Sequence, residues 1–152
     1  PQTGALMGAF LWWTNRGQGC GGIRLREFGT TEEWLRDGIR LATGMGRKSA
    51  LAGLWWGGGK GVIARAPGDR HLDPEYRREL MEDYGRFLTS LRGCYVAAED
   101  SGINVDDVDV VFGQTRFTTC ISPHLGGSGN PSVPTAAGVV CAMEAAVDHM
   151  GS

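Results

Sequence analysis

The sequence predicts an α/β domain in which helices cover a layered sheet. Short apolar runs at residues 5–13, 23–25, 61–64 and 94–98 are typical of strands, and they alternate with longer segments whose apolar residues recur at helical spacing. Such an alternation favours a sheet flanked by helices. No repeat, low-complexity tract or internal linker interrupts the chain of 152 residues, so we expect a single domain over residues 1–152.

The composition is that of an ordinary globular protein. Hydrophobic residues make up 41% and charged residues 21% of the chain, and the formal net charge is -2, so nothing favours a nucleic-acid or membrane partner. The four cysteines form no CxxC pair, which argues against a zinc site and for reduced thiols in a cytoplasmic protein. We expect no metal, no signal peptide and no membrane span.

Glycine is the outlier of the composition. The chain has 25 glycines, and they cluster at residues 17–22, 57–61 and 126–129. Because glycine lacks a side chain, these clusters predict places where a ligand or another backbone comes close.

The first elements are a buried strand at residues 5–13, a glycine loop, and a short strand at 23–25. A helix should follow Thr30, which could form a capping box with Glu33, and should end near residues 44–46. Its expected apolar residues are Trp34, Leu35, Ile39, Ala42 and Met45.

The most clearly marked helix follows Asp73, an N-cap, and Pro74 at the first helical position. Its apolar residues recur at short intervals: Tyr76, Leu80, Tyr84, Leu88 and Leu91. A strand at 94–98 should then present Glu99 and Asp100 at its end.

Two further helices are expected toward the end of the sequence. Asn104 would cap a short helix that runs to residue 112, and Ser132 or Thr135 would begin the last helix. The apolar stripe of the last helix consists of Val139, Val140, Met143, Val147 and Met150.

Three segments combine glycine, charge and a strand end, the usual setting of sites in α/β proteins: residues 44–60, 97–102 and 126–135. Three consecutive glycines followed by Lys60 predict a cation in a confined place, at the junction of a loop and a strand. A phosphate-binding loop is excluded, since GxxxxGK[ST] requires glycine at Leu54 and Ser or Thr at Gly61. A simple turn remains an alternative.

Four motifs, in order, resemble those of the glutamate/leucine/phenylalanine/valine dehydrogenase family, with leucine dehydrogenases most similar. Residues 44–60 resemble its paired-lysine signature, because Lys48 and Lys60 stand twelve residues apart. The other motifs are the substrate-loop glycines, the acidic catalytic segment and the glycine-serine turn, at residues 20–24, 98–100 and 127–132. The resemblance extends over residues 17–147.

The resemblance implies a three-layer sandwich with a mixed, mainly parallel sheet. It also implies a substrate-binding and dimerisation domain over residues 1–152, working as a homo-oligomer with NAD. Members of the family continue into a Rossmann domain with a GxGxxG loop, and no such loop follows a strand here, so we expect this chain to be cut from a longer enzyme.

The same resemblance assigns roles to individual residues. Lys48 would hold the substrate α-carboxylate, and Asp100 would exchange protons with the substrate amino group. Lys60 would be catalytic and activate water, with a pKa lowered by burial and by the charge of Lys48. The remaining assignments are substrate contacts at Gly21, Gly22, Cys20, Met45 and Ala98, and nicotinamide contacts at Ser132 and Thr135.

Structural readings of the same residues compete with these roles. Asp100 could be a solvated acid at a strand end or a helix cap, and Met45 and Ala98 could belong to the core. Ser132 or Thr135 could be helix caps. The histidines match no catalytic position, and we expect all three on the surface: His71, His124 and His149.

The implied reaction is the oxidative deamination of an L-amino acid to its 2-oxo acid and ammonia. Apolar positions at Cys20, Met45 and Ala98 favour a hydrophobic substrate, leucine or another branched-chain amino acid ahead of phenylalanine, tryptophan or valine. Trp55 and Trp56 depart from the smaller pair that leucine dehydrogenases carry, which leaves the substrate open.

Two rival functions belong to other classes. One is a stand-alone amino acid binding or regulatory module, and the other is a purely structural dimerisation domain. The joint presence of Lys48, Lys60 and Asp100 argues against the structural domain. Self-association is expected through residues 5–13, which would be an aggregation-prone edge if left bare.

Overall fold

The computed structural model describes residues 2–65 and 68–151. Pro1 and Ser152, the limits of the expected domain, lie outside the described residues. The elements, in chain order, are β1 (Met7–Trp12), β2 (Gly19–Arg26), α1 (Thr31–Leu51), β3 (Gly57–Ala64), α2 (Pro74–Ser90), β4 (Tyr95–Glu99), α3 (Val105–Phe112) and α4 (Ser132–Met150). Single 3-10 turns lie at Thr14–Arg16, Asp69–Leu72 and Pro123–Leu125.

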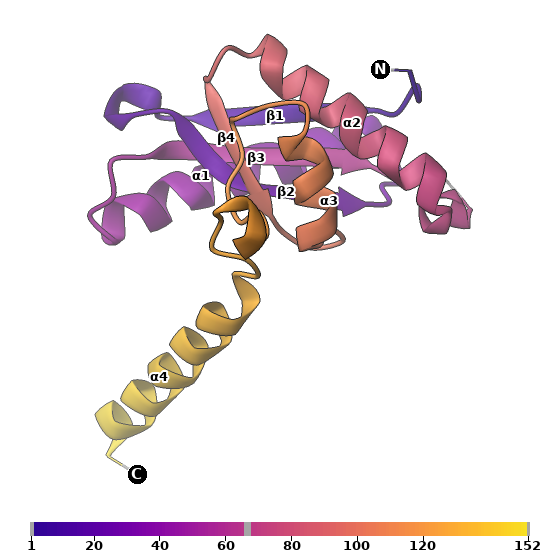
Figure 1. The fold of residues 1–152 in the computed structure, drawn as a ribbon. Coiled ribbons are helices and arrows are strands. Elements are labelled where there is room, and N and C mark those ends of the chain that lie inside the picture. Colours follow the sequence, from indigo (N-terminus) through magenta and orange to yellow (C-terminus); the bar gives the residue numbers. More distant parts are fainter. Residues whose placement is uncertain (1, 66–67, 152) are drawn as a thin grey trace.

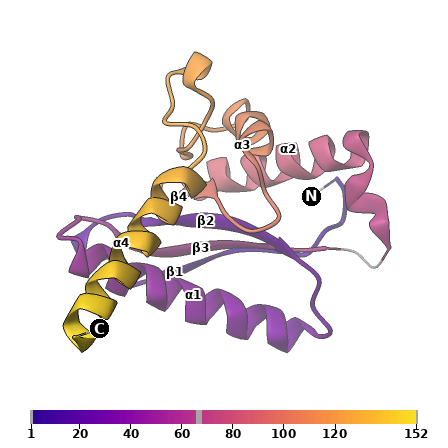
Figure 2. The same cartoon turned by 90° about the horizontal axis from the view of Figure 1, so that it is seen from below.

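The four strands form one mixed sheet in the order β1-β3-β2-β4. β1 runs antiparallel to β3, whereas β2 is parallel to both β3 and β4. α1 covers one face of the sheet, and α2 and α3 cover the other (Figures 1 and 2). The predicted three-layer arrangement with a mainly parallel sheet is confirmed.

The main core lies between the sheet and the layer of α2 and α3. Four of the five predicted apolar residues of α2 are buried there: Tyr76, Leu80, Tyr84 and Leu88. Ile23 of β2, Ile63 of β3 and Val108 of α3 pack against them and are fully buried. The predicted caps are also present, since Asp73 accepts a hydrogen bond from the Glu75 amide and Asn104 forms a capping box with Asp107.

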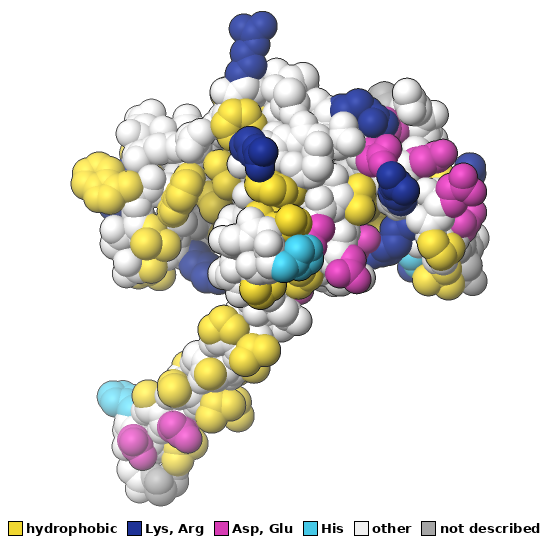
Figure 3. Space-filling model, in the orientation of Figure 1, with side chains coloured by type: hydrophobic (Ala, Val, Ile, Leu, Met, Phe, Trp, Pro, Cys, Tyr) yellow, Lys and Arg dark blue, Asp and Glu magenta, His cyan; other side chains and the backbone are white. Residues whose placement is uncertain are grey.

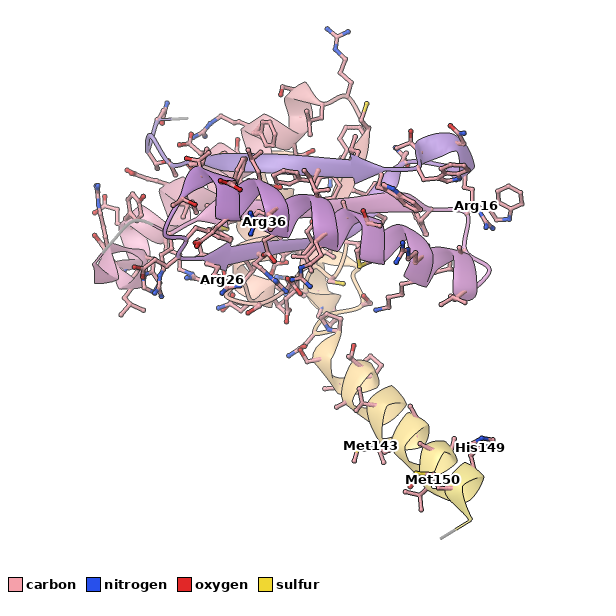
Figure 4. All side chains as sticks on the ribbon, turned by 180° about the vertical axis from the view of Figure 1, so that it is seen from behind. Arg16, Arg26, Arg36, Met143, His149 and Met150 are labelled. Carbon is pink, nitrogen blue, oxygen red and sulfur yellow. The ribbon has the colours of Figure 1, made fainter. Side chains whose placement is uncertain are left out.

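α1 differs from its prediction in length and in its buried face. It continues past residues 44–46 to Leu51, and Leu35 and Ile39 face solvent. Small residues are buried instead, because aromatic side chains of β1 fill the space against them: Phe10 lies against Gly38 and Trp12 against Gly46. Figure 4 shows α1 from this side, lying along the sheet.

Three strand predictions were wrong in detail. β2 begins at Gly19, so Gly19, Gly21 and Gly22 belong to the strand and not to a loop before residue 23. The glycines before Lys60 form no loop, because β3 already begins at Gly57 and Lys60 lies in its middle. Residues 5–13 were expected to be buried, but β1 is the edge strand of the sheet, with 43% of Leu11 and 60% of Trp13 exposed. Glycine suits β3 because the backbones of α1 and β2 approach it closely.

α4 begins at Ser132, as one of the two alternatives predicted, and extends away from the body of the molecule (Figure 1). Figure 3 shows hydrophobic side chains along the length of α4. They include Val139, Val140 and Met143, which are more than half exposed. Among the residues described, no helix is both long and apolar enough to span a membrane.

Candidate active site

A cavity of about 660 Å³ opens beside α1, on the side of the sheet that faces this helix, and Met45 and Lys48 of α1 line it. All ten residues assigned from the sequence line it: Lys48, Lys60, Asp100, Cys20, Gly21, Gly22, Met45, Ala98, Ser132 and Thr135. They come from α1, β2, β3, β4 with the loop after it, and the first turn of α4. Segments far apart in the sequence therefore meet at one place.

Strand register explains how the polar residues come together. Alternate residues of a strand share a face, so Cys20, Gly22 and Arg24 of β2 lie on one side of the sheet. Cys20 pairs with Gly58 and Arg24 with Val62, which puts Gly22 beside Lys60 of the parallel strand β3. Lys60 therefore points to the same side of the sheet as these residues of β2. This is the side that faces α1, because Arg24 pairs with Asp37 of α1.

Lys60 and Asp100 form the central ion pair of the cavity. The Lys60 Nζ atom lies 2.8 Å from Asp100 Oδ2, and only 5% of the lysine side chain is exposed. Asp100 follows directly after β4, and 27% of its side chain is exposed. A buried ammonium group next to a half-buried carboxylate is an arrangement in which a proton can move between a bound molecule and the protein.

The pKa of Lys60 lies below its ordinary value because burial disfavours the charged form. The hydrogen bond and the charge of Asp100 oppose this effect but do not cancel it. The neighbouring cation that lowers the pKa further is Arg24, whereas the sequence led us to expect Lys48. Lys48 is exposed, near the end of α1.

The pKa of Asp100 is also held below its usual range. Burial alone would raise it, but the hydrogen bond and charge of Lys60 and the charge of Arg24 outweigh burial. The carboxylate is therefore ionised at neutral pH. Its reading as a plain solvated acid is contradicted by these contacts.

Gly22 makes room for Asp100. A Cβ atom on Gly22 would stand 2.5 Å from the Asp100 Cβ and 2.6 Å from the Glu99 carbonyl oxygen, closer than real Cβ contacts. With glycine at this position, the Asp100 side chain lies over β2 and reaches Lys60. The sequence predicted that a ligand or another part of the backbone comes close at the glycines of residues 17–22. At Gly22, Asp100 and the Glu99 carbonyl group come close.

Sequence reasoning missed the ion-pair network behind the cavity. Arg24 Nε lies 3.1 Å from Asp100 Oδ2, and Arg24 Nη1 lies 3.2 Å from Asp37 Oδ2 on α1. Glu99, which the sequence placed beside Asp100 without a role, also lines the cavity; burial raises the pKa of this carboxyl, and its Oε2 has no hydrogen-bond partner among the described residues. The sequence signal for Arg24 is its place at the end of the substrate-loop motif, two residues after Gly22.

The first turn of α4 forms the rim of the cavity. Neither Ser132 nor Thr135 caps the helix: the Asn130 side chain accepts a hydrogen bond from the Ser132 amide at 2.7 Å, and the Thr135 hydroxyl donates to the Pro131 carbonyl. Capping therefore does not explain their presence at the rim.

The histidines lie away from the cavity, but one prediction about them was wrong. His124 and His149 are exposed as expected, whereas His71 is half-buried, with its Nε2 3.2 Å from Arg65 Nη1.

The family of the chain follows from comparison with known proteins. Residues 10–117 match the model of the family described as Glu/Leu/Phe/Val dehydrogenase, dimerisation domain. The chain belongs to this family.

Individual relatives agree with this assignment. The chain is 44% identical over 133 residues to a leucine dehydrogenase of Geobacillus stearothermophilus, which covers 88% of this chain and 35% of the relative. It is 44% identical over 139 residues to a valine dehydrogenase of Streptomyces coelicolor, covering 90% of this chain and 36% of the relative. The crystal structure of L-tryptophan dehydrogenase from Nostoc punctiforme matches with a TM-score of 0.73 at 28% identity, over 97% of this chain and 39% of that protein. The chain thus spans about a third of the length of these relatives.

Proposed function

We propose that this chain is the substrate-binding and catalytic domain of an NAD-dependent dehydrogenase that oxidatively deaminates a hydrophobic L-amino acid, with a branched-chain amino acid as the main substrate. The observation that carries the proposal is the buried Lys60–Asp100 ion pair, 2.8 Å long, in a cavity that Lys48 also lines. A purely structural domain gives no reason to keep these charges in a cavity, because burying charge is costly.

Lys48 is suited to hold the substrate carboxylate. Its ammonium group is a compact point charge on a flexible stem, and its exposed position near the end of α1 faces a ligand that enters from solvent. Gly21 and Gly22 leave the backbone of β2 bare beside it, which lets the substrate approach the sheet.

Lys60 and Asp100 would move the protons of the reaction. The substrate ammonium must lose a proton before its Cα is oxidised, and the ionised Asp100 carboxylate is a suitable acceptor. Lys60, whose pKa is lowered by burial, can take a proton from the water that hydrates the imine. Its return to the charged form then supports the loss of ammonia.

The lining of the cavity favours an apolar substrate side chain. Cys20, Met45 and Ala98 lie on its wall, and Ile103 and Cys120 extend the apolar surface. Among the described lining residues, Lys48 and Lys60 are the only cations, and both have a role already. A glutamate substrate would need a third cation for its side-chain carboxylate.

The rim of the cavity fits a nicotinamide. Ser132 and Thr135 bring two hydroxyl groups to it, and the Thr135 oxygen can still accept a hydrogen bond while it donates to Pro131. When bound, NAD supplies the acceptor for the hydride that leaves the substrate Cα. In this proposal, a Rossmann domain outside this sequence provides the larger part of the NAD site. We also propose that the protein works in the cytoplasm.

Self-association also belongs to the proposal. The matching family model is described as a dimerisation domain. Within the described part of the chain, β1 has a strand partner on one side only, and Leu11 and Trp13 are exposed. An unpaired edge with apolar side chains is a suitable surface for a second copy of the chain.

The proposal is tested by assaying the complete natural protein and this 152-residue chain side by side with NAD and L-leucine. We expect NADH and the 2-oxo acid from the complete protein and none from the chain alone, because holding the two reactants together supplies about 7 to 11 kcal/mol of the barrier. NADH formation by the chain alone would place the cofactor site within it and contradict the division into two domains. A complete protein that binds leucine without oxidising it would instead be a regulatory module.

A further inference from the structure

Two cations meet the Asp100 carboxylate at the same oxygen atom. Lys60 Nζ lies 2.8 Å and Arg24 Nε 3.1 Å from Asp100 Oδ2. The far side of the Arg24 guanidinium is bound as well, since Nη1 donates to Asp37 Oδ2 at 3.2 Å. Arg24 therefore joins the buried face of α1 to the proton-transfer pair.

We propose that Arg24 is a positioning residue, whose guanidinium group is anchored by Asp37 and holds the Asp100 carboxylate beside Lys60 in both protonation states of the lysine. The inference rests on the proposed function for the roles of Lys60 and Asp100. The contacts that carry it are properties of the chain alone.

The need for a second cation follows from the work of Lys60. When Lys60 gives up its proton, Asp100 loses an ion-pair partner while it stays half-buried, and an uncompensated carboxylate in such a place is costly. Arginine keeps its charge at every working pH, and its planar fork can serve two carboxylates at once. Arg24 thus keeps Asp100 ionised and in place when Lys60 is neutral.

The charges around the pair balance in that neutral state. Facing Lys60 and Asp100 are Arg24 from β2 and Asp37 from α1, and Arg40 Nη2 reaches Asp37 Oδ1 at 2.8 Å. With Lys60 neutral, these groups comprise two cations and two carboxylates. Arg40 is 66% exposed in its side chain and contributes little, whereas 19% of Arg24 is exposed, so Arg24 dominates.

Lysine-selective NMR tests this inference in the chain itself. The sequence contains two lysines, Lys48 and Lys60, so a 13C label at lysine Cε gives two signals, which Lys48→Ala assigns. In Arg24→Gln we expect the titration midpoint of Lys60 to move up, because a like charge next to it is lost. The control is Arg26→Gln, the same change on an exposed residue of β2, which should leave the midpoint in place. An unmoved Lys60 midpoint in Arg24→Gln would overturn the inference.

A second variant separates the charge of Arg24 from the geometry of its planar guanidinium group. Arg24→Lys keeps the charge but cannot bridge Asp37 and Asp100, so the Lys60 midpoint should stay near that of the wild type. In the complete protein, kcat should still fall about tenfold with KM nearly unchanged, and Arg24→Gln should lose about ten- to a hundredfold, the range of a hydrogen bond to a charged group. A wild-type kcat in Arg24→Lys would refute the positioning role.

Asp37→Asn covers the case in which Arg24→Gln does not fold. It preserves the shape of the side chain and should lower kcat in the same direction. If Asp37 acts only through Arg24, the double variant Asp37→Asn/Arg24→Lys should be no slower than Arg24→Lys alone. Additive losses would contradict the anchoring role of Asp37.

The failure of each proposal has its own signature. A wild-type complete protein without dehydrogenase activity would end the proposed function, and the Lys60 titration would then decide the role of Arg24 by itself. An active wild-type protein whose Arg24→Gln variant keeps both its kcat and its Lys60 midpoint would end the role of Arg24 alone.

Discussion

The Asp100 side chain lies directly above Gly22, so close that a methyl group on Gly22 would stand 2.5 Å from the Asp100 Cβ. The absence of a side chain at position 22 is therefore a condition for the Lys60–Asp100 pair. The sheet brings Lys60 to this place through strand register, and the glycine lets the carboxylate meet it.

Gly22→Ala should displace Asp100 and impair the reaction. A misplacement of about 1 Å typically costs on the order of 10²-fold in rate, so we expect such a loss of kcat/KM in the complete protein. Gly44→Ala is the matched control, because its added Cβ would meet nothing within 4 Å on the exposed face of α1. It should keep full activity and raise the free energy of unfolding by about 0.5 to 1 kcal/mol. Equal activities for the two variants would show that the reaction does not need the space that Gly22 leaves for Asp100.

Lys60→Ala should abolish turnover in the complete protein without unfolding it. Loss of a positioned base typically costs about 10²- to 10⁴-fold. Lys60→Arg should be equally inactive, because arginine stays charged and cannot accept a proton. Steady-state kinetics with L-leucine, checked by circular dichroism, measures both effects. More than about a tenth of wild-type activity in Lys60→Ala would remove Lys60 from the catalytic role.

The free energy of unfolding should depend on pH through Asp83. Its buried carboxylate accepts hydrogen bonds from the Thr3 amide and hydroxyl at 2.7 Å and from Arg86 at 2.8 Å. Burial would raise its pKa, but these bonds hold the pKa well below the usual range. A lowered pKa in the folded state stabilises the fold above the unfolded value of about 4, and this contribution is lost as the pH falls through the folded value.

Asp83→Asn should therefore lower the free energy of unfolding by about 1 to 3 kcal/mol at pH 7 and flatten its fall in acid. Urea denaturation at several pH values between 7 and 2 measures this. Glu79→Gln, on the exposed side of the same helix, is the control and should change little. If the wild type and Asp83→Asn lose stability in parallel below pH 4, another carboxylate governs the acid response.

Leu11→Lys should weaken self-association. Leu11 is 43% exposed on the edge strand β1, and a lysine there discourages pairing with a second copy. Sedimentation velocity at tens of micromolar should show an oligomer for the wild type and a shift toward monomer for Leu11→Lys. Leu72→Lys, at another exposed leucine, should keep the wild-type assembly. A monomeric wild type with Leu11 and Trp13 accessible would argue decisively against association through β1.

The sequence predicts those elements whose local pattern and tertiary role agree. α2 has a cap, a proline at its first turn and an apolar stripe that faces the core, so each signal points to the same helix. Lys60 was assigned to the junction of a loop and a strand because the strand was expected to begin at Gly61. β3 nevertheless forms there, since neighbouring backbones need the space that side chains would take.

The candidate site residues were assigned from motifs, but the contacts between them were not predicted. A motif places Lys60 and Asp100 in one site, but which atoms meet depends on strand order and register. Arg24 illustrates this limit, because its partners Asp37 and Asp100 lie 13 and 76 residues away in the chain. Local patterns also misplaced the end of α1, where Gly46 faces Trp12 within the helix and does not stop it.

The central claim, that this cavity binds the carboxylate and amino group of an amino acid, is tested most directly by titrating L-leucine into the lysine-labelled chain. Affinity should be weak, because closure by a second domain normally excludes water from such a cleft. Both lysine signals should nevertheless shift and saturate with L-leucine, and D-leucine should be a poorer ligand. In Lys48→Ala the Lys60 response should require much more leucine. Lysine signals that do not move with L-leucine, or a Lys60 response that is the same without Lys48, would contradict the assignment of this cavity.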